Sequence, residues 1–185
     1  MIEFSHIPVM PEECMKGLAL KDGGVYFDGT IGGGGHSYEI LKRTSPNGRL
    51  IATDLDDNAI AAATKRLSEF AGRFQIYKSN YKNYAAVLER AGADKLDGVM
   101  LDFGVSIFQL DEESRGFSYM KSAPLDMRMS QEGPTAADFL ASVSREELAR
   151  VLREYGEEPY AWQIAGKVVA YRQEQPLVST AQLAQ

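Results

Sequence analysis

Cysteine and histidine are scarce in this chain, and long apolar runs are missing. Its 185 residues include one cysteine, Cys14, and two histidines, His6 and His36. A single cysteine excludes an internal disulfide and fits a reducing cytoplasm, and without paired cysteines we expect no zinc or other metal site. The sequence contains no run of about 18 apolar residues, so no membrane span is predicted. The N-terminus lacks the basic and apolar regions of a signal peptide. We therefore expect a cytoplasmic protein without a membrane partner.

Positive charge is also in short supply. The formal net charge is −6 at pH 7, which argues against a protein that holds nucleic acid through a broad basic surface. Hydrophobic residues make up 44% of the chain and charged residues 25%, which is the balance of a globular domain. Any nucleic-acid contact is therefore expected to be local, or to depend on a pre-assembled target.

Strand and helix patterns alternate through roughly the first hundred residues. Short apolar runs predict four strands, and amphipathic stretches between them predict three helices. This order predicts an α/β protein with a Rossmann-like, doubly wound parallel sheet. The predicted strands are 25–28, 49–54, 74–77 and 96–102, and the predicted helices are 36–43, 58–70 and 84–90.

The pattern changes after Asp102. Residues 103–133 hold many Gly, Ser and Pro residues and predict an ordered but irregular segment, with only helices beyond it. The last predicted helix begins just before the chain ends, so we expect the sheet and the fold to be incomplete. We assign residues 1–110 to the α/β core and residues 111–185 to a helical insertion. Helix starts are predicted at Thr135, at the capping box opened by Ser144, at Pro159 and at the capping box opened by Ser179.

A glycine-rich loop, Asp28-Gly29-Thr30-Ile31-Gly32-Gly33-Gly34-Gly35-His36, joins the first predicted strand to the first predicted helix. Glycines there permit a sharp turn and a close approach of a ligand to the backbone. A P-loop requires Gly-Lys-Ser/Thr, which is missing, and a dinucleotide fingerprint counted from Gly32 and Gly34 has Ser37 in place of its third glycine. A dinucleotide-dependent oxidoreductase and a merely flexible turn remain the alternatives.

S-adenosylmethionine has no phosphates, and its groups suit this loop. Its carboxylate matches the backbone N–H groups at a helix N-terminus, here near Gly34, Gly35 and His36. We therefore predict these three residues as cofactor-binding. The alternative for His36 is that its side chain caps the helix or packs against it.

Three aspartates end predicted strands and complete this interpretation. Asp54 suits the ribose hydroxyls, because an ionised carboxylate only accepts hydrogen bonds. Asp28 suits the ammonium group, and Asp102 stands where open α/β sheets bind ligands. The alternative is that Asp54 or Asp56 only caps the following helix; we predict that Asp56 or Asp57 caps and that Asp54 binds.

Further segments resemble the ribosomal RNA small-subunit methyltransferase H family. The resemblance covers essentially the whole chain, and the Pro-Leu-Asp-Met-Arg-Met and Tyr-Gly-Glu-Glu segments are its most specific parts. The matching segments are His6-Ile7-Pro8-Val9 with Glu12-Glu13, Asp28 to Ser37, Asp54-Leu55-Asp56, Leu101 to Ser106, Gln109-Leu110-Asp111, Arg115 to Ser118, Pro124 to Met129, Thr135 to Leu140 and Leu152 to Glu158.

The resemblance implies a class I methyltransferase fold and transfer of a methyl group from S-adenosyl-L-methionine to the N4 amine of a cytidine in the decoding region of 16S ribosomal RNA. Family members are longer, so a fragment that binds cofactor without turnover is a further alternative. Ser106-Ile107-Phe108-Gln109 departs from the family's Ser-Ser-Pro-Gln. The implied cofactor contacts are Gly34, Gly35, His36, Asp54, Tyr81, Asp102 and Gln109, and Tyr81 would stack on the adenine.

The implied partner is ribosomal RNA within the small ribosomal subunit. Asp102 is the candidate catalytic residue, which would accept a hydrogen bond from the cytidine N4–H group; the alternative is that it only binds cofactor. A splayed base would stack on Phe108, Phe117 or Tyr119. Arg115 and Arg128 would hold phosphates or the base edge, or instead pair with Asp111, Glu112 or Asp126.

Overall fold

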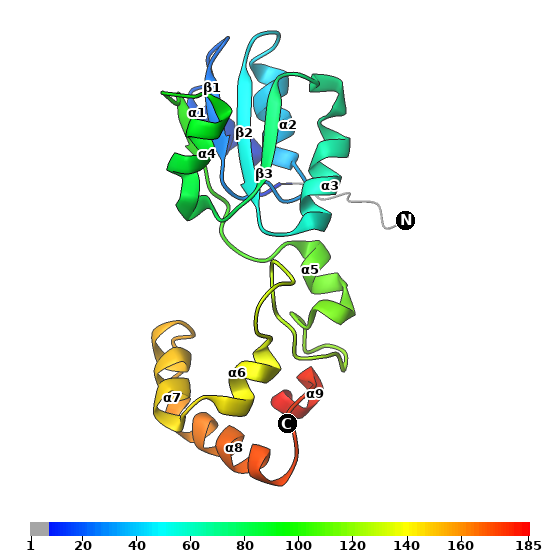
Figure 1. Ribbon diagram of the computed structural model, residues 1–185, viewed down its shortest axis with the longest axis vertical. Coiled ribbons are helices and arrows are strands. Elements are labelled where there is room, and N and C mark those ends of the chain that lie inside the picture. Colours follow the sequence, from blue (N-terminus) through cyan, green and yellow to red (C-terminus); the bar gives the residue numbers. More distant parts are fainter. Residues whose placement is uncertain (1–7) are drawn as a thin grey trace. The chain divides into compact units, whose positions relative to one another are not determined.

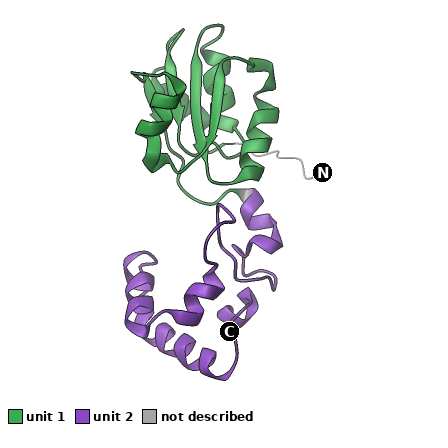
Figure 2. Ribbon diagram, viewed as in Figure 1, with its two compact units in different colours: residues 1–106 green, residues 107–185 purple. Residues whose placement is uncertain are grey.

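The computed structural model describes residues 8–185 (Figure 1). The chain forms two compact units, Met1–Ser106 and Ile107–Gln185 (Figure 2), whereas the sequence placed the boundary after residue 110. Within the described residues, no helix is long and apolar enough to cross a membrane. Unit 1 contains α1 (Pro11–Leu18), β1 (Val25–Asp28), α2 (Gly35–Arg43), β2 (Arg49–Asp54), α3 (Asp57–Arg66), β3 (Phe74–Lys78), α4 (Tyr84–Ala91) and β4 (Gly98–Met100).

The four strands form one parallel sheet in the order β3-β2-β1-β4 (Figure 1). The chain moves outward from β1 through β2 to β3, and then returns past β1 to form β4 on the opposite edge. In such a sheet the carboxyl ends of all strands meet at one side, and ligands bind where the direction of winding reverses. That point lies between β1 and β4, beside the glycine loop.

Helices cover both faces of the sheet. Tyr26 and Leu50 pack with residues of α1, α2 and α3 in one core cluster. Phe27 and Ile51, the next residue along each strand, pack with Val87 of α4 in a second cluster. Because successive side chains of a strand point to opposite faces, this division confirms the predicted doubly wound α/β fold.

Local structure follows the sequence closely at some points and departs from it at others. The side chain of Asp56 caps α3 by accepting a hydrogen bond from the Asn58 N–H group, as predicted. Helix α3 ends at Arg66 and is followed by a separate 3₁₀ turn, so the predicted single helix 58–70 is wrong. Helix α1 was not predicted; no side chain caps its N-terminus, where Met10 is in the left-handed region.

Unit 2 is helical, as predicted. Thr135 and Ser179 open reciprocal capping boxes. Ser144 only accepts from the Glu147 N–H group, so the capping box predicted there is wrong, because the Glu147 carboxylate binds Arg150. The expected start at Pro159 is wrong, because Tyr160 is the N-cap and its N–H group donates to Glu158 Oε1 at 2.8 Å. Unit 2 contains α5 (Ile107–Asp111), α6 (Ala136–Ser142), α7 (Arg145–Glu154), α8 (Ala161–Glu174) and α9 (Thr180–Ala184).

Candidate functional site

The glycine loop is a tight, hydrogen-bonded turn. Gly34, the N-cap of α2, has a φ of 76° and donates its N–H group to the Ile31 carbonyl at 2.8 Å. A Cβ added at Gly34 would lie 3.2 Å from Ala63, so a larger residue would meet both backbone strain and a neighbouring helix. The glycine therefore lets α2 begin close against α3.

The N-terminus of α2 carries no side-chain cap and no acidic residue in its first turn. The alternative in which His36 caps this helix is wrong, because Gly34 holds the N-cap position. His36 is buried, with 6% of its surface exposed. The positive end of the helix dipole is thus not neutralised by a capping side chain, which suits a ligand carboxylate.

Asp54 fastens the glycine loop to the end of β2. Its Oδ2 accepts a hydrogen bond from the Gly32 N–H group at 2.9 Å. Its Oδ1 accepts from the N–H groups of Leu55 and Asp56 at 2.8 and 3.0 Å. Since a carboxylate offers about four acceptor positions, this half-buried group keeps room for about one further donor.

Asp28, at the end of β1, is buried and sits among like charges. Its Oδ2 accepts from the Ser37 hydroxyl at 2.6 Å and its Oδ1 from the Thr30 N–H group at 3.1 Å. Burial, and to a smaller extent the Asp54 and Asp102 carboxylates, raise the pKa of Asp28 to about 6 against the opposing effect of these two hydrogen bonds. A cationic group placed here would favour the ionised form.

Asp102 lies two residues beyond β4 and next to the α2 N-terminus. Its N–H group donates to Thr30 Oγ1 at 2.7 Å, which ties this turn to the glycine loop. Its Oδ2 lies 3.9 Å from His36 Nε2, and 43% of the Asp102 side chain is exposed. The backbone of Asp102 is thus anchored while its carboxylate remains accessible to solvent.

Two aromatic side chains approach each other at the same edge of the sheet. Tyr81 follows β3 and Phe103 follows β4, and their ring centroids are 5.5 Å apart. A Cβ added at Gly29, beyond the end of β1, would lie 2.8 Å from Tyr81 Cβ. The sequence interpretation missed Phe103, although a large apolar residue directly after a candidate catalytic carboxylate was a signal.

The structure therefore brings together six of the predicted site residues at the carboxyl edge of the sheet. Gln109 is buried within α5 of unit 2, and its cofactor contact stays a prediction. His6 and Ile7 of the resemblance lie outside the described residues. The six predicted site residues at the carboxyl edge of the sheet are Gly34, Gly35, His36, Asp54, Tyr81 and Asp102.

A cavity of about 420 Å³ lies beside the first turn of α2. It shares Gly35 with the candidate site, but none of the three strand-end aspartates lines it. Its lining residues are Pro8, Pro11, Glu12, Gly35, Tyr38, Glu39 and Arg66.

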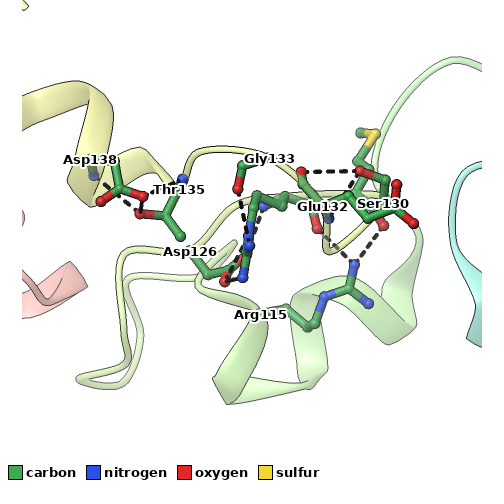
Figure 3. Close-up of polar contacts among 9 residues, drawn as sticks. Arg115, Asp126, Ser130, Glu132, Gly133, Thr135 and Asp138 are labelled. Atoms are coloured by element: carbon green, nitrogen blue, oxygen red, sulfur yellow. Dashed lines mark hydrogen bonds and ion pairs between the residues drawn. The ribbon is translucent and has the colours of Figure 1, made fainter.

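In unit 2, the two arginines considered for RNA contact bind a loop of the same unit, as Figure 3 shows for Arg115. The Arg128 guanidinium binds both carboxylate oxygens of Asp126 and donates to the Gly133 carbonyl at 3.1 Å. Arg115 is buried and its Nη2 donates to the carbonyls of Arg128 and Met129, both at 2.9 Å. The pairing alternative with Asp126 is confirmed for Arg128, and both guanidinium groups are engaged inside the protein.

Comparison with known proteins gives consistent matches. A family model described as the MraW methylase family matches residues 3–185. The chain is 50% identical to ribosomal RNA small subunit methyltransferase H of Symbiobacterium thermophilum, over 97% of this chain and 57% of the relative. It is 49% identical to the protein of the same name from Lachnospira eligens, over 99% of this chain and 58% of the relative.

Among solved structures, the chain is similar to a SAM-dependent methyltransferase from Aquifex aeolicus, with 17% identity, a TM-score of 0.38, and coverage of 80% of this chain and 79% of that one. The chain spans less than three fifths of the length of the two curated relatives named above.

Proposed function

The chain belongs to the MraW methylase family, and we propose that its protein transfers a methyl group from S-adenosyl-L-methionine to the N4 amine of a cytidine in the decoding region of 16S ribosomal RNA. The observation that carries the proposal is the bond between Gly32 and Asp54, which joins the ligand loop after β1 to the carboxylate after β2. The relatives' name, ribosomal RNA small subunit methyltransferase H, supports the RNA substrate.

The described residues offer a partner for each polar group of the cofactor. The uncapped α2 N-terminus at Gly34, Gly35 and His36 would receive the carboxylate. Asp54 would accept a hydrogen bond from a ribose hydroxyl at its remaining acceptor position.

Two more residues complete the cofactor site. Asp28, whose burial disfavours its charged form, would be neutralised by the ammonium group. Tyr81 would stack on the adenine, since 40% of its surface is exposed at the same edge. A cofactor contact of Gln109, in α5 of unit 2, stays a prediction from the resemblance.

The bound cofactor supplies an electrophilic methyl group on a sulfonium leaving group. The residues of this chain have to orient the attacking amine in line with that methyl group. The lone pair of the cytosine N4 amine is delocalised into the ring. Asp102, with its carboxylate accessible and its backbone held by Thr30, would accept a hydrogen bond from the N4–H group and stabilise the positive charge that develops on nitrogen.

The charge of the chain bears on how RNA is recognised. Unit 2 has twelve acidic and eight basic residues, and Arg115 and Arg128 are engaged internally. Broad electrostatic attraction to RNA is therefore weak. We infer that the substrate is a small ribosomal subunit, or a late precursor of one, in the cytoplasm, in which the target cytidine is already presented by shape.

The test has two arms. In the first, calorimetry compares S-adenosylhomocysteine with NAD as ligands of the 185-residue chain; binding of NAD but not of S-adenosylhomocysteine would refute the cofactor assignment. In the second, the chain and a full-length relative are incubated with labelled cofactor and small subunits, followed by mass-spectrometric nucleoside analysis. We expect N4-methylcytidine with the full-length protein. Cofactor binding by the chain without turnover would support the fragment alternative.

A further inference from the structure

The contact between Tyr81 and Phe103 joins the two outer edges of the sheet. Strands β3 and β4 are separated by β2 and β1, and neighbouring strands lie about 4.8 Å apart, so the strands themselves are about 14 Å apart. The rings nevertheless approach to 5.5 Å between centroids. Close packing of Tyr81 against Gly29 places its side chain beyond the end of β1.

Phe103 is unusually open to solvent for its type. The ring has 68% of its surface exposed, although it contacts Tyr81. Its neighbour Asp102 is held by Thr30, so the position of the turn does not depend on packing of the ring. Gly104, with a φ of 140°, follows directly. An exposed phenyl group on an anchored turn can receive a flat ligand without the rearrangement of a core.

We propose that Phe103 is a stacking platform for the pyrimidine base that presents its exocyclic amine to Asp102. This inference rests on the proposed function. Adjacent residues are about 3.8 Å apart at Cα. The edge of a base stacked on Phe103 would therefore lie close to the Asp102 carboxylate. Stacking suits an unpaired base because every base has an apolar face, whatever its hydrogen-bonding edge.

The contact between Tyr81 and Phe103 bears on where the adenine and the target base would each bind. Phe103 is tilted by 56° against Tyr81 and approaches it from one side. Tyr81 keeps 40% of its surface exposed beside this contact, which leaves room for the adenine. Tyr81 and Phe103 then serve cofactor and base respectively, and their mutual contact sets the spacing between the two.

The test places an indole at each of two aromatic positions. Trp162 is the only tryptophan of the chain, so Phe103→Trp is made in a Trp162→Phe background. The matched control is Tyr84→Trp in the same background, because Tyr84 is also an exposed aromatic, at 55%, on the segment after β3. The probes are S-adenosylhomocysteine, and small ribosomal subunits, whose RNA carries the target cytidine, added to the protein saturated with S-adenosylhomocysteine.

We expect the RNA to quench the fluorescence of the Phe103→Trp protein and to leave the Tyr84→Trp control unchanged. We also expect Phe103→Ala to weaken RNA binding roughly ten-fold with an unchanged Kd for S-adenosylhomocysteine. No further quenching by RNA once the protein is saturated with S-adenosylhomocysteine would overturn the proposal. A wild-type chain that binds no S-adenosylhomocysteine would instead count against the proposed function.

For a full-length family member with phenylalanine at this position, the same substitution separates stacking from chemistry. Phe103→Ala should raise KM for small subunits roughly ten-fold and change kcat less. Phe103→Tyr, which keeps the ring, should restore KM. A loss confined to kcat, or a failure of tyrosine to restore KM, would contradict the assignment.

Discussion

The hydroxyl of Ser37, in the first turn of α2, donates a 2.6 Å hydrogen bond to the buried carboxylate of Asp28 at the end of β1. This bond and the Thr30 N–H group favour the charged form of Asp28, but burial outweighs them and raises the pKa. The carboxylate is therefore held in place for binding at some expense of stability, which makes Asp28 the most informative position for a pH experiment.

The first prediction concerns Asp28→Asn and stability. The pKa of Asp28 is raised from 3.8 to about 6 in the folded protein, so folding is favoured by the protonated form. That contribution is present below pH 3.8 and is lost as pH rises to about 6. Asparagine cannot ionise. Its Oδ1 can accept from the Thr30 N–H group and its Nδ2 can donate to the Ser37 hydroxyl, so we expect it to raise the free energy of unfolding at pH 8 by on the order of 2 kcal/mol. Urea unfolding at pH values from below 3.8 up to 8 measures this.

In the same experiment the exposed residue Asp94 is the control. Asp94→Asn should leave both the stability and its pH dependence unchanged. An Asp28→Asn protein whose stability tracks that of the wild type across the pH range would show that Asp28 does not titrate there.

The second prediction concerns Asp54. Asp54→Ala removes the acceptor proposed for the ribose and releases the Gly32 N–H group. We expect binding of S-adenosylhomocysteine in calorimetry to weaken roughly ten- to hundred-fold. The control is Asp57→Ala, because Asp57 is close in sequence but exposed and paired with Lys78 at 2.9 Å. Equal affinities for the two variants would remove Asp54 from the site.

The third prediction concerns Gly34. An alanine at a φ of 76° costs about 1–2 kcal/mol, and its Cβ would also approach Ala63 to 3.2 Å. Gly92→Ala is the matched control, because Gly92 has a φ of 66° and nothing within 4 Å of the added Cβ. Urea unfolding should show a larger loss for Gly34→Ala than for Gly92→Ala. Indistinguishable losses would mean that packing against α3 imposes no constraint.

The fourth prediction concerns Asp102→Ala in the full-length protein. Removing the proposed acceptor of the N4–H group should lower methyl transfer to small subunits by about 10²–10⁴-fold. Nucleoside mass spectrometry measures the product, and calorimetry with S-adenosylhomocysteine shows how much of the loss arises in cofactor binding. Glu89→Ala, at an exposed position of α4, controls for the lost charge. Turnover at the wild-type rate would exclude Asp102 from the reaction.

The fifth prediction concerns the loop of unit 2 shown in Figure 3. Lysine cannot reproduce the two-pronged contact of Arg128 with Asp126. Arg128→Lys should therefore destabilise unit 2 by about 1–2 kcal/mol and speed amide hydrogen exchange in residues 126–139. The exposed Arg153 gives the control Arg153→Lys. Unchanged exchange in both variants would show that the loop does not depend on this pair.

Much of the fold could be predicted because local signals and tertiary structure agree. The apolar runs of β1 and β2 are bounded by turns, and both strands have the predicted limits. The caps at Asp56, Thr135 and Ser179 follow from short-range hydrogen bonding that the sequence alone encodes.

The features that escaped prediction depend on distant parts of the chain. Helix α1 packs against α2 and lacks a side-chain cap, so its only start signals are Pro11 at the first position and the acidic Glu12 and Glu13 of the first turn. The approach of Phe103 to Tyr81 requires the order of the strands, which places one residue after each outer strand. The buried position of Arg115 likewise depends on a loop more than ten residues away.

The glycine loop is bound to its surroundings by hydrogen bonds that include those of Ser37 to Asp28, Gly32 to Asp54 and the Asp102 N–H group to Thr30. The cradle at the strand ends thus has its shape before any ligand arrives. Affinity is then not diminished by the entropy of ordering the cradle, and preorganisation of this kind favours tight binding by a small molecule. Capture of the cofactor should accordingly proceed as a single kinetic step whose rate rises linearly with concentration, without a slower phase for loop closure.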